Sequence, residues 1–474
     1  MTRTEFIHQM YALFPYEPTK GQAELIDALT AFLYLRDQNS LFLLKGYAGT
    51  GKTTIVSLLV RLFKLLGKKT LLMAPTGRAA KVLSAYARAP AFTIHKQIYQ
   101  LQSTAGGGIQ LFLAENKHRN TLFIIDEASM IPDESTSIDS HSFGGRRLLD
   151  DLMEFTYSGN NCRMILLGDD AQLPPVGLDI SPALDLNYLK SNYHQQILHF
   201  ELKDVVRQAE DSGILSNATT IRNNLDTEGI SRLINHHQFN DVSAITGEML
   251  EEYLQESFSG KDAEDSIIVT RSNKRANVFN QEVRKRILLR ENEIAAGDLL
   301  MIVKNNYFWV PKNSKIGFLA NGDLIEIMRI EGYEELYGYR FASVNVRLID
   351  YPDENDISIK ILLDTLQIDG PSLSSNETSG FMDEVMKDYE DIPTRRQKIE
   401  KVKNNPWFNA VQVKFGYALT CHKTQGGQWD NVFIDLGYLN EEFIDRSFYR
   451  WLYTAFTRAR KKIYLINFPE RFFT

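Results

Sequence analysis

The organisation of the chain follows from the stretch Gly46-Tyr47-Ala48-Gly49-Thr50-Gly51-Lys52-Thr53. An apolar run at 41–44, typical of a buried strand, comes before it, and apolar residues at helical spacing follow between positions 55 and 66. A GxxxxGK[ST] pattern between a strand and a helix predicts a phosphate-binding loop. The alternative is a glycine-rich turn that ends in Lys-Thr by chance.

This stretch predicts a site for a nucleotide and Mg²⁺. Glycines let the backbone pass close to phosphate oxygens, and the positive end of the following helix adds to the attraction. Lys52 would reach the β- and γ-phosphates, and the Thr53 hydroxyl would bind Mg²⁺. The residues expected around the phosphates are Gly46, Ala48, Gly49, Thr50, Gly51, Lys52, Thr53 and Thr54.

Composition and charge restrict the class of protein. A length of 474 residues is enough for roughly two to four domains. The two cysteines, Cys162 and Cys421, cannot form a disulfide framework, and no apolar run reaches the ~20 residues that span a bilayer. We therefore expect a cytoplasmic protein that does not contact membranes. The net charge of −7 argues against electrostatic coating of nucleic acid but permits a narrow nucleic-acid channel. The sequence shows no internal repeat.

Two further apolar strands end in polar groups suited to hydrolysis. The run 121–125 ends in Asp126 and Glu127; Asp126 would hold Mg²⁺, and Glu127 would orient and deprotonate a water. The run 164–168 leads to Gln172, which would contact a γ-phosphate or that water. Strands that alternate with helices predict an α/β fold with a parallel sheet and ligands at its carboxyl edge. The alternative for 121–127 is a chance Asp-Glu pair after a strand.

Other polar residues are compatible with nucleic acid or with a base, but each has an ordinary explanation. The loop 75–80 follows a strand and offers small, hydroxyl and basic groups that suit a sugar–phosphate backbone. It could equally be a plain strand-to-helix turn. Gln22, near the start of a helix at 19–36, has an amide that matches the edge of adenine. An exposed helix glutamine is the alternative.

From about residue 199 the strand and helix pattern starts again without a second phosphate-binding loop. Arg207 and Arg458 stand at the ends of elements in this half and are candidates for arginine fingers that stabilise charge on the γ-phosphate. Each could instead be a surface arginine in a salt bridge. Residues 324–407 contain short strands and charged helices, which predict an inserted β-barrel with helices. The charged helix faces there indicate solvation rather than phosphate contacts.

A glycine-rich turn joins two alternating runs, 97–102 and 109–113. This pattern predicts a β-hairpin, inserted over about 98–118 and projecting from the core strands. Such a hairpin could separate a duplex as a wedge, or it could be a surface hairpin that only caps the sheet.

Taken together, the ordered motifs resemble those of superfamily 1 helicases, specifically the 1B branch of RecD-like and Dda-like 5′→3′ DNA helicases. They span nearly the whole chain. In order they are Gln22, GYAGTGKT, APTGRAA, TIH, DEAS, GDDAQLPPV, VVRQ, YALTCHKTQGG and YTAFTRAR. The resemblance implies two RecA-like motor domains with parallel sheets, at 1–198 and at 199–323 plus 408–474. It also implies a barrel within 324–407 and a wedge hairpin.

The resemblance further assigns site residues. It implies ATP between the two motor domains, with Gln22 on adenine, Gly426 in a coupling loop near the nucleotide, and Gln172, Arg207 and Arg458 at the γ-phosphate. It implies single-stranded DNA and strand–duplex junctions as partners of a monomeric motor that moves 5′→3′. The residues that fall on the DNA track are Pro75, Thr76, Arg78, Thr93, His95, Thr420, His422 and Lys423. Two other functions stay open: a phosphate-loop ATPase that acts as a switch, and a helicase subunit of a nuclease complex.

Overall fold

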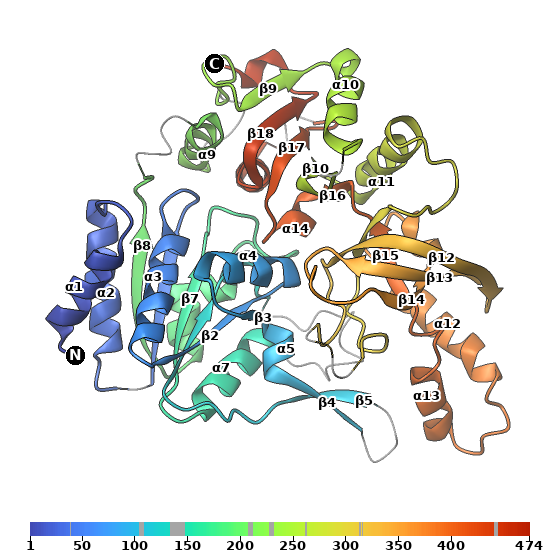
Figure 1. The fold of residues 1–474 in the computed structure, drawn as a ribbon, viewed down its shortest axis with the longest axis horizontal. Coiled ribbons are helices and arrows are strands. Elements are labelled where there is room, and N and C mark those ends of the chain that lie inside the picture. Colours follow the sequence, from blue (N-terminus) through green and yellow to red (C-terminus); the bar gives the residue numbers. More distant parts are fainter. Residues whose placement is uncertain are drawn as a thin grey trace.

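The computed structural model describes residues 1–37, 39–103, 109–132, 147–206, 212–226, 232–260, 263–311, 314, 316–439 and 444–474; for 101–103, 109–111, 395 and 396 it describes only the backbone. The chain forms two parallel sheets and a closed barrel (Figure 1). We call each sheet with its covering helices a domain, the first in the N-terminal half and the second mostly in the C-terminal half.

The first domain has a six-stranded sheet in the order β3-β2-β6-β7-β1-β8, with every pair parallel. Its strands are β1 (Ser40–Gly46), β2 (Lys69–Ala74), β3 (Ala91–Thr93), β6 (Thr121–Ile125), β7 (Arg163–Gly168) and β8 (Gln196–Leu202). Its helices are α1 (Arg3–Leu13), α2 (Lys20–Leu33), α3 (Lys52–Leu65), α4 (Gly77–Ala87), α5 (Ile94–Ile98), α7 (Leu148–Ser158) and α8 (Leu186–Asn192). The predicted parallel α/β fold is confirmed.

The apolar run at 41–44 is continuous because both faces of β1 are covered. Phe42 and Leu44 pack in one cluster with residues of α2 and α3, and Leu41 and Leu43 pack in another with residues of α7. A strand in the middle of a parallel sheet has no solvent face, so alternation of polar and apolar residues disappears. This burial fixes the position of the loop that follows β1.

The second domain has a five-stranded parallel sheet in the order β16-β10-β17-β18-β9. Its strands are β9 (Val242–Ile245), β10 (Ser266–Thr270), β16 (Ala418–Thr420), β17 (Trp429–Asp435) and β18 (Ala459–Ile466). Its helices are α9 (Gly213–Asn223), α10 (Gly247–Phe258), α11 (Asn273–Glu282), α14 (Cys421–Thr424) and α15 (Arg446–Phe456). The two sheets have corresponding strands in the same order: β16 corresponds to β3, β10 to β2, β17 to β6, β18 to β7 and β9 to β1.

The expected boundary at residue 199 is wrong. Residues 199–202 belong to β8, which pairs in parallel with β1 from Ser40 opposite Gln196 to Gly46 opposite Leu202. Only Leu202 of β8 is buried, and the other residues of this edge strand are partly or fully exposed, so the strand lacks the continuous apolar burial of β1. The sequence therefore did not mark it as the last strand of the first sheet.

The barrel contains β11 (Leu299–Ile302), β12 (Leu324–Leu336), β13 (Tyr339–Leu348), β14 (Ile357–Leu362) and β15 (Val411–Phe415). Helices α12 (Ser375–Lys387) and α13 (Arg395–Lys403) lie beside it (Figure 1). The barrel is thus larger than the expected segment 324–407, because β11 and β15 lie outside that range and close it by pairing with each other.

The predicted hairpin is present. Strands β4 (Tyr99–Ser103) and β5 (Ile109–Leu113) pair antiparallel, with Tyr99 opposite Leu113 and Ser103 opposite Ile109. Figure 1 shows the pair extending beyond the first sheet at the end of α5. The Tyr99 hydroxyl donates a 2.7 Å hydrogen bond to Asp151 Oδ2 on α7, which anchors the base of the hairpin to the first domain.

Candidate functional site

The loop between β1 and α3 is shaped by its glycines and by Lys52. Gly49 and Gly51 have φ angles of 76° and 88°, which L side chains rarely adopt. Lys52 Nζ donates to the carbonyl oxygen of Gly46 and, at 2.9 Å, to that of Tyr47. The ammonium group is thus folded back over the loop, where phosphate oxygens would replace these carbonyls. We call residues 46–53 the phosphate loop.

Three carboxylates lie at the carboxyl ends of strands beside this loop. Asp126 and Glu127 follow β6, and Asp169 follows β7. Burial raises the pKa of all three carboxyl groups, and the positive charge of Lys52 opposes that increase in each. The shared influence of one lysine indicates that the three groups surround the same space.

These residues fit a magnesium nucleotide. Asp126 is buried beside Lys52, and Asp126 Oδ1 accepts a bond only from the adjacent Glu127 amide, at 2.9 Å, among the bonds of the described residues. No group of three or more His, Cys, Asp or Glu side chains suited to a metal occurs in the described ranges. Thr53, Asp126 and phosphate oxygens are therefore the groups that would hold Mg²⁺, as in other phosphate-loop sites.

Gln172 lies where a ligand could use it. Its side chain is only 7% exposed, and its Oε1 atom has no hydrogen-bond partner. A buried amide oxygen without a partner costs free energy unless a ligand or water satisfies it. The Gln172 backbone N–H donates to Asp169 O at 3.3 Å, which keeps the residue next to the carboxylates.

The second domain reaches this space through Arg458, which follows α15. The guanidinium is buried and donates to the carbonyl oxygens of Thr454 (3.0 Å) and Gly427 (3.2 Å). Its positive charge lowers the pKa of Glu127, against the larger effect of burial. Arg458 therefore lies close enough to Glu127 of the first domain to influence its charge. Arg207, the other expected finger, lies outside the described residues.

Side chains of α15 and α14 hold the loop after β7 directly. The Tyr453 hydroxyl contacts Asp169 Oδ2 (2.7 Å) and the Ala48 amide (2.8 Å). Thr454 Oγ1 accepts from the Leu173 amide at 2.9 Å, and Gln425 Nε2 donates to the Leu173 carbonyl at 2.7 Å. The sequence contained YTAFTRAR, yet nothing in it assigned a role to Tyr453, because its partners are far away in the chain.

Gln22 is completely buried rather than exposed. Its Oε1 accepts from the Thr19 amide at 3.0 Å in a capping box at the start of α2, and its Nε2 donates to Thr50 O at 3.1 Å. A Cβ on Gly51 would lie 2.5 Å from Gln22 Nε2, so the glutamine lies directly on the phosphate loop. Gln22 therefore joins α2 to that loop; contact with adenine stays a prediction.

The expected DNA residues of the first domain follow β2 and β3. Pro75 and Thr76 come directly after β2, and Thr76 caps α4 by accepting from the Ala79 amide at 3.2 Å. Thr93 caps α5 in the same way, through the Lys96 amide. Burial lowers the pKa of His95 to about 4, so His95 is neutral at physiological pH and could offer only hydrogen bonds.

Arg78 and Gly426 lie at the contact between the two domains. The Arg78 guanidinium lies 3.9 Å from the ring centre of Trp429 in the second domain, and burial lowers its pKa. Gly426 packs against the first domain: an added Cβ would lie 2.7 Å from Ala79 Cβ and 3.1 Å from Thr76 Oγ1. Gly426, expected near the nucleotide, thus lies against Thr76, which is expected on DNA.

The residues expected on DNA in the second domain repeat those expected in the first. Thr93-Ile94-His95-Lys96 begins at the last residue of β3, and Thr420-Cys421-His422-Lys423 begins at the last residue of β16, the strand at the same position of the other sheet. His422 is exposed, and burial together with the charge of Lys414 lowers the pKa of Lys423 to about 8. This four-residue repeat was missed in the sequence because it is short and its copies are far apart.

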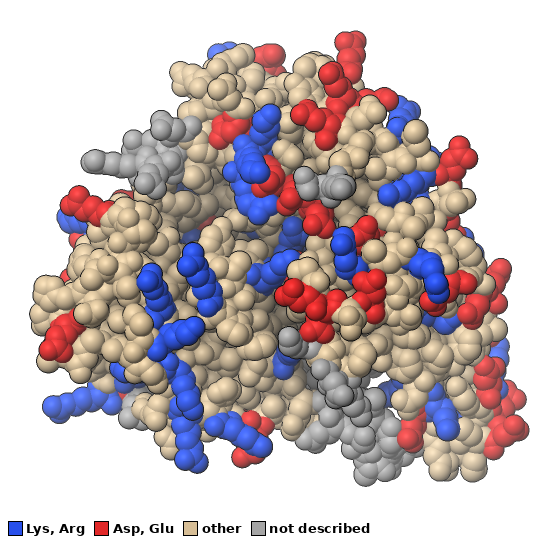
Figure 2. Space-filling view, viewed as in Figure 1, with Lys and Arg blue, Asp and Glu red and all other residues tan. Residues whose placement is uncertain are grey.

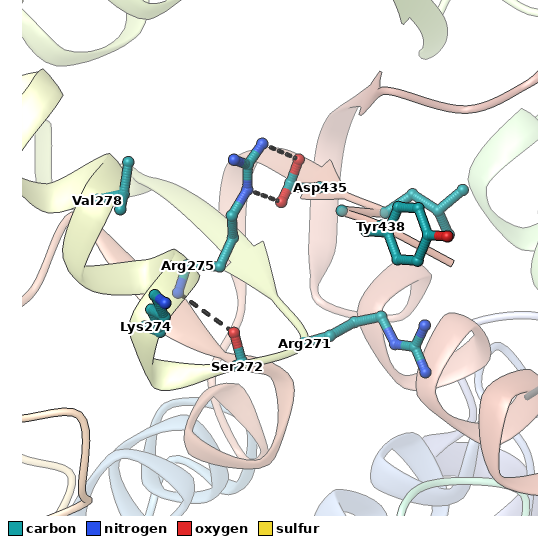
Figure 3. A pocket seen from close by; sticks show the side chains of 9 residues that line it. Arg271, Ser272, Lys274, Arg275, Val278, Asp435 and Tyr438 are labelled. Carbon is teal, nitrogen blue, oxygen red and sulfur yellow. Dashed lines mark hydrogen bonds and ion pairs between the residues drawn. The ribbon is translucent and has the colours of Figure 1, made fainter. Parts of the chain in front are cut away.

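A cavity with a volume of about 620 Å³ lies at the ends of β10 and β17 (Figure 3). Arg271, Lys274 and Arg275 line it from the start of α11, opposite Tyr438, which is 96% exposed. Asp435 forms a bidentate ion pair with Arg275, with a shortest distance of 2.7 Å. The carboxylate at the end of β17 is therefore already neutralised.

Charge is distributed unevenly on the face shown in Figure 2. Lys and Arg side chains gather over the region that Figure 1 places at α3 and α4, and Asp and Glu are more frequent toward the barrel. The exposed cations on these elements and their flanks are Arg61, Lys64, Lys68, Lys69, Lys81 and Arg88. No helix of the described part of the chain is long and apolar enough to cross a membrane.

Two family models match the chain, an AAA domain over residues 18–244 and a UvrD-like helicase C-terminal domain over residues 415–466. The chain is 24% identical over 467 residues to the ATP-dependent RecD2 DNA helicase of Deinococcus radiodurans, covering 95% of this chain and 50% of that protein. It is 23% identical to the ATP-dependent DNA helicase dda of Enterobacteria phage T4, covering 89% and 93%. A Bacteroides Pif1 helicase solved with ADP-AlF3 and ssDNA has 16% identity and a TM-score of 0.48, covering 97% and 95%.

Proposed function

The chain shares the domain pair and the ordered motifs of superfamily 1B helicases, and from this premise we propose that it is an ATP-driven DNA helicase that moves 5′→3′ on single-stranded DNA. One observation carries the proposal: Tyr453 of the second domain bonds both the phosphate loop and Asp169 of the first domain, and the charge of Arg458 acts on Glu127. An ATPase site shared by two domains can convert hydrolysis into relative domain movement.

We assign the hydrolytic roles as follows, with support from the geometry for the described residues. Lys52 leaves its carbonyl partners to bind phosphate oxygens, and Glu127 takes a proton from the attacking water while Gln172 orients it. Arg458 and Arg207 stabilise charge that develops on the γ-phosphate. Mg²⁺, when bound, supplies further neutralisation of phosphate charge, and Thr53 and Asp126 are the residues that would hold it.

The proposed DNA track joins the ends of three strands. Pro75, Thr76 and Arg78 follow β2. Thr93 ends β3 and His95 follows it; Thr420 ends β16, and His422 and Lys423 follow it. Support comes from the repeated Thr-x-His-Lys sequence, because two copies at matching strands give the two domains matching grips on one strand of DNA.

Several finer points belong to the same proposal. The motor domains comprise 1–202 and 203–298 with 416–474, and the barrel lies between them in the chain. The motor acts as a monomer, the hairpin formed by β4 and β5 is the wedge that divides the duplex, and Gln22 contacts adenine. The cytoplasm is the proposed location because Cys162 and Cys421 are both free and buried.

The experiment that tests the proposal measures ATPase activity with and without single-stranded DNA, and then the unwinding of duplexes with 5′ or 3′ tails. We expect stimulation by DNA and unwinding of the 5′-tailed substrate alone. ATPase activity that ignores DNA would favour a phosphate-loop switch. Co-purification with a nuclease from native lysate would favour a subunit of a larger complex.

A further inference from the structure

The hydroxyl of Tyr453 joins the second domain to two parts of the ATP site. Tyr453 lies on α15 and is 1% exposed. Its hydroxyl oxygen accepts a 2.8 Å hydrogen bond from the Ala48 amide in the phosphate loop and donates a 2.7 Å bond to Asp169 Oδ2 after β7. Tyr453 therefore bridges the phosphate loop and the segment after β7.

The direction of these bonds is fixed by chemistry. Burial, with the adjacent Asp169 carboxylate, raises the pKa of Tyr453 well above its usual value, so the hydroxyl keeps its single proton. That proton is given to Asp169, and the oxygen can therefore only accept from Ala48. A backbone amide has one proton to donate, so a phosphate oxygen that binds the Ala48 amide must displace the tyrosine.

The phosphate concerned is the terminal one. Lys52 and Thr53, at the start of α3, are at one end of the phosphate loop, and Ala48 is near the other end. Through Tyr453, Ala48 is linked to Asp169, three residues before Gln172, the residue expected at the attacked phosphate. The Ala48 amide therefore lies on the side of the site where hydrolysis occurs.

We propose that Tyr453 is a positioning residue that competes with the terminal phosphate of ATP for the Ala48 amide. Without nucleotide, the tyrosine holds the second domain to the phosphate loop. A triphosphate takes the amide and releases this contact, whereas a diphosphate leaves it in place. The inference rests on the proposed function, because it assumes that ATP occupies the phosphate loop.

Neighbouring contacts determine what the release changes. Thr454 and Gln425 hold the amide and the carbonyl of Leu173, and Arg450 donates to the carbonyl of Asp179. These bonds do not involve the phosphate loop, so α15 stays attached to the loop after β7 when Tyr453 loses Ala48. Binding of the triphosphate therefore removes the hydrogen bond between Tyr453 and the phosphate loop, while Arg222 of α9 keeps its contact with the Tyr47 ring at 4.2 Å. The loop that carries Gln172 stays attached to the second domain.

The test is Tyr453→Phe, which removes the hydroxyl and keeps the ring. Equilibrium binding of ADP and of a non-hydrolysable ATP analogue is measured by calorimetry without DNA. We expect the analogue to bind about fivefold more tightly, the effect of one competing hydrogen bond worth about 1 kcal/mol, and ADP to bind as before. The kcat of hydrolysis should fall, because Asp169 loses its only bond from the second domain among those of the described residues.

Tighter binding of the analogue together with a lower kcat distinguishes this role from a loss of structure. A loss of structure would lower both the affinity for the analogue and kcat. Two matched controls remove one hydroxyl each: Thr454→Val, one residue along α15, and Tyr157→Phe, whose hydroxyl donates to Ser40 O at 2.9 Å on the first domain. Both should keep the wild-type ratio of ADP to analogue affinity. The Tm of each variant is measured first, and binding is measured well below the lowest Tm.

Three results would overturn the proposal: unchanged affinity for the analogue, weaker affinity for it, or an equal gain for ADP. Because these measurements need no DNA, they are independent of whether the protein is a helicase. If DNA failed to stimulate hydrolysis while Tyr453→Phe behaved as expected, the proposed function would fall and the role of Tyr453 would stand.

Discussion

The strands of the two domains correspond in the same order, but the carboxylates at the ends of β6 and of its counterpart β17 have different surroundings. In the first domain β6 is followed by Asp126, a buried carboxylate next to Lys52. In the second, β17 ends in Asp435, which is fully engaged by Arg275. The second sheet thus retains the architecture of a nucleotide-binding domain but has no free carboxylate there to hold a metal.

This difference shows how one scaffold can provide two functions. Both domains keep a Thr-x-His-Lys sequence after the corresponding strands β3 and β16. Only the first has the phosphate loop, and the second contributes Tyr453 and Arg458 to it from α15 and its end. The sequence predicted to contact nucleic acid is thus duplicated, whereas the proposed ATP site belongs to one domain and is completed by the other.

The largest effect should come from the lysine that the second domain lacks. Lys52→Ala removes the cation that faces the phosphates and the three carboxylates, and DNA-stimulated ATPase activity should fall to background. The matched control is Lys45→Ala on β1, which pairs with Asp170 at 3.2 Å outside the phosphate loop and should keep most activity. Residual hydrolysis in Lys52→Ala would mean that the second domain also has a catalytic site.

Removal of the arginine finger proposed for the second domain should lower ATPase activity nearly as much. Arg458→Ala should lower kcat by about 10³-fold with little change in nucleotide affinity, because an arginine finger acts mainly in the transition state. Arg460→Ala is the control, since Arg460 lies two residues on and pairs with Asp265 at 2.8 Å on the surface. A change confined to the Michaelis constant would place Arg458 in ground-state binding instead.

A third change separates movement from strand separation. Replacing residues 101–111 by a glycine-serine linker spares Tyr99, whose bond to Asp151 anchors the base of the hairpin. Opening each base-pair step costs about 1.4 kcal/mol. Without a rigid wedge, forward stepping of the motor no longer forces the duplex to open. We expect unwinding to fall about tenfold while DNA-stimulated ATPase activity and single-strand translocation persist. Unwinding at the wild-type rate would exclude the hairpin as the wedge.

The smallest effect concerns how the affinity for single-stranded DNA depends on pH through Lys423. Lys423 has a pKa of about 8 in the free protein, so it is charged at pH 7 and largely neutral at pH 9. If it binds a DNA phosphate, the affinity for single-stranded DNA should weaken severalfold as the pH rises through 8. Lys423→Arg stays charged and should abolish this dependence. The salt slope at pH 7 should fall by ~0.7 in Lys423→Ala. An equal pH dependence in wild type and Lys423→Arg would remove Lys423 from the track.

The sequence was sufficient to predict the structural features that depend on a local pattern of residues. The phosphate loop, the Asp126–Glu127 pair, the hairpin and the existence of a barrel all follow from neighbouring residues. The barrel limits did not, because Leu299–Ile302 and Val411–Phe415 read like any buried strand, and only their mutual pairing assigns them to the barrel. The end of the first sheet was misplaced for a related reason, since β8 is recognisable only through its pairing with β1.

Contacts between the two domains could not be predicted from single residues. Arg78 was expected on DNA, yet it stacks on Trp429, more than three hundred positions away. Gln22 was weighed as an exposed helix residue, yet the loop that it contacts covers it completely. Tyr453 had no signal at all, because its role is defined by Ala48 and Asp169, which lie in the other half of the chain.

The connection between the barrel and the second sheet has a mechanical consequence. Strand β15 ends at Phe415 and β16 begins at Ala418, so two residues separate the barrel from the strand that leads to Thr420. Both are confined: a Cβ on Gly416 would lie 3.2 Å from Leu324, and the buried Tyr417 hydroxyl bonds Asp298 and Arg290. A rotation of the barrel cannot be absorbed by so short and rigid a connection. Any force on the barrel is therefore transmitted as torque to the strand that carries Thr420, a residue predicted to contact DNA.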